Sequence, residues 1–116
     1  MSNSQPKDQE LLKSILEPLF EDFQYWFSRS EVLLNSERLP FLSLDEQNDL
    51  LSRLKQAQQE VATARLLFKV TGEKVGIESK ILVPWHKLVA QCWQVSREWR
   101  SLQKAKENAN REENEA

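Results

Sequence analysis

The sequence has few of the residues that build common catalytic and metal sites. Its 116 residues include one cysteine and one histidine, Cys92 and His86. A single cysteine excludes an internal disulfide, which favours a reducing cytoplasm. A zinc site requires about four closely spaced ligands, which these two residues do not provide. Their spacing also keeps a thiol and an imidazole on different faces of a helix. We therefore expect no metal site and no thiol catalysis.

Glycine and long apolar runs are scarce as well. The chain has two glycines and four prolines, whereas an all-β fold needs many turns. It has no glycine-rich phosphate loop, so we expect no cofactor. No run approaches the roughly 18 apolar residues of a membrane-spanning helix. The polar stretch 1–10 lacks the apolar segment of a signal peptide. These absences predict a soluble, cytoplasmic protein without enzymatic activity.

Helical periodicity is what the sequence does have, and it first appears between Asp8 and Ser36. Apolar residues recur there every three or four positions, which is typical of one broad helix face. Pro18 lies inside this stretch, has no N–H and crowds the carbonyl of Ser14. The sequence therefore predicts one helix with a kink near Pro18. Its apolar face comprises Leu12, Leu16, Leu19, Phe20, Phe23, Trp26, Phe27, Leu33 and Leu34.

Two further helices are predicted after residue 43. Ser43 and Glu46 have the spacing of a capping box, which starts a helix at Leu44, and Gly72 is suited to end that helix after residue 71. Pro84 is suited to the first position of a third helix. We expect residues 73–83 to form a connection that folds back over the end of the second helix. The third helix carries an apolar face of Trp85, Leu88, Val89, Cys92, Val95, Trp99 and Leu102.

These patterns predict an all-α fold of three long antiparallel helices, an up-down-up bundle. We expect a disordered N-terminus (1–7), a bundle domain (8–103) and a charged disordered tail (104–116). Segment 8–37 has seven acidic and two basic residues (−5), and segment 79–106 has six basic residues and one acidic residue (+5). Complementary flanks of this kind favour pairing of the first and third helices. A homodimer is an open alternative, because it would bury more surface of a thin bundle.

One flank of the predicted third helix is a candidate for partner binding. It comprises His86, Val89, Trp93, Arg97 and Arg100. Trp and Arg are enriched at binding hot spots, and Arg97 lies four residues after Trp93, where it can stack on the indole. In the alternative interpretation, Trp93 only covers the edge of the bundle and contacts the 73–83 connection.

Two other positions are candidates. Tyr25 points away from the core face of the first helix and shares its side with Val32, although scattered exposed apolar residues are common. Arg65 falls inside the apolar face of the second helix, as Gln47 and Gln58 do. We expect either a peptide-binding groove or a buried polar layer, in which Arg65 must be paired, for instance with Glu31. Alternatively, Arg65 lies along the edge with its charge in water.

Several stretches resemble a known family, namely 16–27, 56–61, 84–89 and 92–95. The resemblance extends over residues 11–100, most of the chain, and is to a family of short cyanobacterial proteins known only as a domain of unknown function. The resemblance implies a cyanobacterial cytoplasm, near thylakoid or carbon-fixation machinery. It implies no activity and provides no catalytic residues.

The residues favour a non-enzymatic helical interaction module, an adaptor or assembly factor that binds another protein. The flank containing Trp93 and Arg97, or the groove at Arg65, would be its binding site. The alternative is a peripheral membrane or thylakoid-associated factor that uses the basic, Trp-bearing third helix. We do not expect nucleic-acid binding, because the acidic first helix and tail oppose the basic surface of the third helix.

Overall fold

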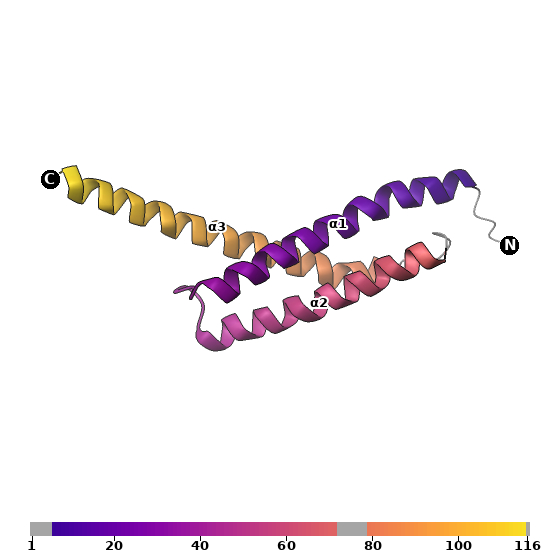
Figure 1. Ribbon diagram of the computed structural model, residues 1–116, viewed down its shortest axis with the longest axis horizontal. Helices are drawn as coiled ribbons and strands as arrows, with labels where there is room; N and C mark the ends of the chain where they lie inside the picture. Colours follow the sequence, from indigo (N-terminus) through magenta and orange to yellow (C-terminus); the bar gives the residue numbers. More distant parts are fainter. Residues whose placement is uncertain (1–5, 72–78, 116) are drawn as a thin grey trace.

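The computed structural model describes residues 6–71 and 79–115, which form three helices. These are α1 (Pro6–Ser36), α2 (Leu44–Val70) and α3 (Ser79–Glu115), and no strand occurs within the two described ranges. The predicted all-α fold of three helices is therefore confirmed. Figure 1 shows α2 running back beside α1, while α3 crosses the pair and extends away from it at its C-terminal end.

The molecule is elongated. Its radius of gyration is 19.2 Å and its extents are 74 × 29 × 19 Å, whereas a compact domain of this length has a radius of gyration of about 13 Å. The extension comes largely from α3, because every residue from 104 to 115 is exposed. Only the first part of α3 therefore contributes to the core.

The helix ends differ from the sequence prediction mainly in α3, which begins at Ser79 and contains Pro84. Because proline has no N–H, Pro84 removes one backbone hydrogen bond from the second turn of α3. The helix also continues through 104–115, where we expected a disordered tail. That segment is rich in Glu, Lys and Ala, which are strong helix formers, and it contains no Gly or Pro.

Other expectations concern the ends of α1 and α2. The helix α1 begins at Pro6 and continues through Pro18, and the kink there stays a prediction. The N-terminus (1–7) was expected to be disordered, but residues 6 and 7 belong to α1, and residues 1–5 lie outside the described residues. Of the connection expected at 73–83, residues 79–83 belong to α3, and residues 73–78, like the predicted cap Gly72, lie outside the described residues. The predicted capping box at Ser43 is present: its hydroxyl accepts from the Glu46 N–H at 3.0 Å, and its own N–H donates to the Glu46 carboxylate at 2.8 Å. The latter bond lowers the pKa of Glu46.

The core gathers around the aromatic face of α1. Phe20 packs against Phe68 of α2 with ring centroids 5.9 Å apart, and Phe23 packs against Trp85 of α3 at 5.5 Å. Phe27 stacks on Phe23 at 5.9 Å. These phenylalanines are almost completely buried, and each such burial stabilises the fold by roughly 1.5–3 kcal/mol. The face of α1 thus holds both other helices.

The buried side-chain amide of Gln47, in the first turns of α2, links α2 to the end of α1 and to the loop between the two helices. Gln47 donates to the carbonyls of Leu34 (2.9 Å) and Glu37 (2.7 Å), and its Oε1 accepts from the Leu39 N–H (3.0 Å) and the Arg38 guanidinium (2.8 Å). These four bonds use the full capacity of the amide. They satisfy carbonyls at a helix end that have no partner within the helix. Gln47 therefore fixes the α1–α2 turn.

We predict that Gln47→Ala lowers the free energy of unfolding by about 2–4 kcal/mol, because several buried backbone groups lose their partners. Urea denaturation followed by circular dichroism measures this change. Gln59→Ala is the matched control on the exposed face of α2, and it should change stability by less than about 0.5 kcal/mol. Equal effects of the two substitutions would contradict the role of Gln47.

Candidate protein-binding surface

The crossing of α1 and α3 places two tryptophans against each other. The ring centroids of Trp26 and Trp93 are 5.9 Å apart, and the rings are nearly perpendicular, at 81°. Both line a hollow of about 320 Å³ together with Ser96, Arg97 and Arg100. Trp93 is 48% exposed although it makes this contact. The predicted flank of α3 is therefore continued by a residue of α1.

Tyr25 and Arg29 extend this surface along α1. The Arg29 guanidinium lies 5.4 Å from the Trp26 ring centroid and 5.9 Å from that of Tyr25, and it donates to the Tyr25 hydroxyl at 3.0 Å. The Tyr25 ring packs edge-on against Trp26, with centroids 5.2 Å apart. We refer to these side chains as the aromatic–arginine surface: Tyr25, Trp26, Arg29, Trp93, Arg97 and Arg100.

The structure joins candidates that the sequence analysis kept apart, because Trp26 connects Tyr25 to Trp93. Trp26 itself was predicted in the core, whereas it is partly buried at the edge of the core. Arg29 was not singled out from the sequence. Its position four residues after Tyr25 and three after Trp26 could have identified it, since such neighbours meet on a helix.

Other members of the predicted α3 flank contribute to packing. Val89 is buried in the core. The His86 ring lies 5.1 Å from that of Phe23, so it covers the α1–α3 contact. Trp93 contacts Trp26, whereas the alternative interpretation placed it against the 73–83 connection, of which residues 73–78 lie outside the described part of the chain.

Arg65 belongs to a polar layer between α1 and α2. Its guanidinium donates to the Gln24 side chain at 2.6 Å and lies 3.4 Å from the carboxylates of Glu17 and Glu21. The expected pairing with carboxylates of the first helix is present, but the partners are Glu17 and Glu21. Glu31, the example predicted from the sequence, instead accepts from Gln58 at 2.7 Å, two turns away along α2. The charge of Arg65 is thus held between helices, and its Nε atom is buried with no hydrogen-bond partner.

The Arg65 contacts favour a structural role over a peptide groove. A hydrogen-bonded, partly buried charge between two helices fixes their relative position, because any slip would leave the charge unpaired. A hollow of about 660 Å³ between the same two helices is lined by Gln24, Tyr25 and Arg29 on α1 and by Gln58 on α2. Arg65 does not line it.

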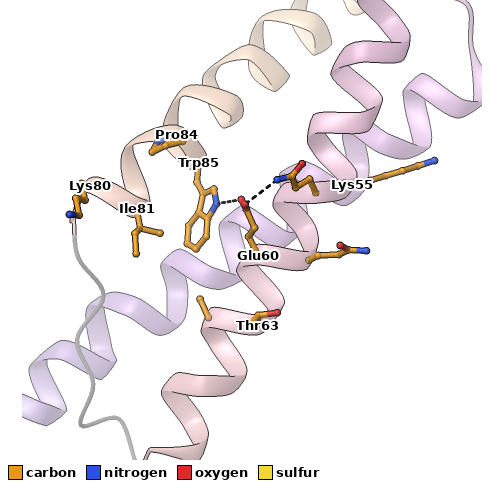
Figure 2. Close-up of a pocket in the computed structure, with 10 residues that line it drawn as sticks. Lys55, Glu60, Thr63, Lys80, Ile81, Pro84 and Trp85 are labelled. Atoms are coloured by element: carbon orange, nitrogen blue, oxygen red, sulfur yellow. Dashed lines mark hydrogen bonds between the residues drawn. The ribbon is translucent and has the colours of Figure 1, made fainter.

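Another hollow lies between α2 and α3 and was not predicted from the sequence. It measures about 990 Å³ and is walled by Glu60 and Ala64 on one side and by Ile81, Pro84 and Trp85 on the other. Figure 2 shows Trp85 pointing from α3 toward Glu60, to which its indole N–H donates at 3.2 Å. The sequence analysis missed this hollow because residues 79–83 were expected in a loop.

Cys92 has the environment of a core residue. It is buried, and this burial raises the pKa of its thiol, so the reactive thiolate is disfavoured. Within 6–71 and 79–115, no three His, Cys, Asp or Glu residues gather closely enough to hold a metal ion. In the same ranges, no helix is apolar over a length that could cross a membrane.

We predict that Trp26→Ala lowers the free energy of unfolding by about 2–4 kcal/mol, since the indole packs on the core and on Trp93. Tyr25→Ala should cost less than about 1 kcal/mol, because the Tyr25 ring is 55% exposed. Thermal melts of the two variants under identical conditions give the comparison. The reverse order of stabilities would overturn the placement of both side chains on α1.

The chain was compared with protein families, curated proteins and solved structures. No curated protein and no solved structure matches the chain. A family model described as a protein of unknown function, DUF2605, matches residues 6–101, which include α1, α2 and the packed part of α3. The chain is a member of the DUF2605 family.

Proposed function

We propose that this chain is a non-enzymatic helical interaction module, an adaptor or assembly factor, that binds another protein through the aromatic–arginine surface. The observation that carries the proposal is the contact of a half-exposed Trp93 with Trp26. Arg29 lies over the Trp26 ring, and two further arginines, Arg97 and Arg100, line the same hollow as the two tryptophans. Trp and Arg dominate binding hot spots because they combine large apolar area with directed hydrogen bonds.

The charge of the surface indicates the chemistry of the partner. Among the described residues, Arg29, Arg97 and Arg100 have no carboxylate within ion-pair distance. A guanidinium binds a carboxylate through two parallel hydrogen bonds. The partner therefore presents acidic side chains around an apolar or aromatic group that fits the hollow between the two tryptophans.

The sequence resemblance and the composition support a proposal for the cellular setting. We place the protein in the cyanobacterial cytoplasm, in agreement with the resemblance of the sequence and with its single, buried cysteine. Lysate of a cyanobacterium that encodes this chain is the source in which the partner should be sought.

We predict that Arg97→Glu/Arg100→Glu loses the partner in affinity purification from that lysate, because the reversed charges repel acidic groups. The control is Lys104→Glu/Lys106→Glu, an equal charge reversal on exposed residues of α3 beyond the surface. The control should recover the partner as the wild type does. Identical recovery by wild type, test variant and control would remove the aromatic–arginine surface from consideration.

A membrane-bound role predicts a different result. Basic, Trp-bearing helices bind anionic bilayers through headgroup attraction and indole insertion. Flotation with vesicles containing anionic lipid should show no strong binding by the wild-type chain. Salt-sensitive flotation that Trp93→Ala abolishes would replace the proposal with peripheral membrane attachment.

A further inference from the structure

The outward face of α1 carries a regular stripe that the fold leaves uncovered. Residues 11, 15, 18, 22, 25, 29 and 32 are separated by alternating steps of four and three, the spacing of a coiled-coil seam. Four of these residues are apolar and exposed: Leu11 (60%), Ile15 (56%), Tyr25 (55%) and Val32 (62%). Pro18 is also exposed and adds an apolar ring. We refer to these seven residues as the α1 stripe.

Two opposite charges interrupt the α1 stripe. Asp22 and Arg29 are seven residues apart, about 10 Å along a helix axis, so they do not pair within α1. Neither has an oppositely charged partner among the described residues. Arg29 instead donates to the Tyr25 hydroxyl. Each charge is thus exposed on an apolar face and available to a group on another molecule.

We propose that the α1 stripe is the seam of an antiparallel homodimer, whose second helix is α1 of another copy of this chain. With the two-fold axis between residues 22 and 25, Ile15 lies opposite Val32 of the partner subunit, and Asp22 lies opposite Tyr25 of the partner subunit. Arg29 of the partner subunit then lies about 6 Å along the axis from Asp22, one helical turn away. Both ion pairs form symmetrically.

The charges also select the direction of pairing. A parallel dimer would place Asp22 against its own copy and Arg29 against its own copy, and like charges across a seam destabilise it. The antiparallel arrangement pairs opposite charges and keeps Ile15 and Val32 together. An elongated, thin monomer such as this one also gains more from added buried surface than a compact domain does.

The dimer seam and the aromatic–arginine surface are separable. Tyr25 and Arg29 belong to both, whereas Ile15 and Val32 lie only on the α1 stripe and Trp93, Arg97 and Arg100 lie only on the aromatic–arginine surface. Loss of dimerisation and loss of the protein partner can therefore be produced by different substitutions.

Sedimentation equilibrium of the full chain tests the proposal. The wild type should have twice the mass of one chain, and Ile15→Glu/Val32→Glu should raise the dimer dissociation constant at least about a hundredfold, since two buried apolar contacts are lost per chain. Leu66→Glu/Leu67→Glu is the matched control, because these residues are exposed on α2. This control should remain dimeric. Circular dichroism verifies that all variants are helical.

A charge exchange tests the direction. Asp22→Arg alone should weaken the dimer, because it faces Arg29 of the partner subunit, and the double variant Asp22→Arg/Arg29→Asp should restore it. A wild type that is monomeric up to its solubility limit would refute the proposal. So would a dimer that Ile15→Glu/Val32→Glu leaves intact. Failure of the double variant to restore pairing would refute the antiparallel register.

Discussion

The rest of the structure depends on the burial of one aromatic face of α1 between the other two helices. Phe20 contacts Phe68 of α2, and Phe23 contacts Trp85 of α3, so neighbouring turns of one helix hold two different partners. A second ring contact, between Trp26 and Trp93, also joins α3 to α1. The hydrogen bonds that join α3 to α2 include the Trp85–Glu60 bond and the exposed Arg53–Gln91 bond, which is 3.0 Å long. The position of α3 is therefore set chiefly by α1.

This dependence gives the candidate surfaces their shape. Because Phe23 and Trp85 fix the crossing point, Trp93 on α3 meets Trp26 on α1 two turns later, and the arginines of both helices gather there. A separate hollow lies between α2 and α3 next to Trp85 (Figure 2). The apolar residues of the α1 stripe are exposed, which leaves this face of α1 open to another molecule.

The features predicted correctly from the sequence depend on interactions between residues that are close together in the chain. The capping box at Ser43 and the apolar face of α1 depend on residues within one or two turns, and both are present in the structure. The placement of Gln47 inside an apolar face was also visible in the sequence. Its partners were not, because the Leu34 carbonyl lies thirteen residues away and meets Gln47 only after the chain turns.

The features that the sequence did not predict fall into two groups: the ends of α3, and the contacts that depend on how the helices pack. The start of α3 at Ser79 conflicts with the preference of proline for the first helical position, and the tail is helical without any packed face. The pairing of Arg65 with Glu17 instead of Glu31 depends on the register between α1 and α2. The meeting of Trp26 and Trp93 depends on a crossing that no periodicity specifies. Local patterns therefore identified the helices, and the surface required the structure.

Hydrogen exchange on the Phe23→Ala variant tests most directly whether α1 positions α3. The substitution removes the contact with Trp85 but leaves the Phe20–Phe68 contact in place, at a cost of about 3–5 kcal/mol. If α1 positions α3, the backbone amides of residues 85–99 lose their protection first, while the backbone amides of α1 and α2 stay protected. Uniform loss of protection over all three helices, or unchanged protection of α3, would contradict it.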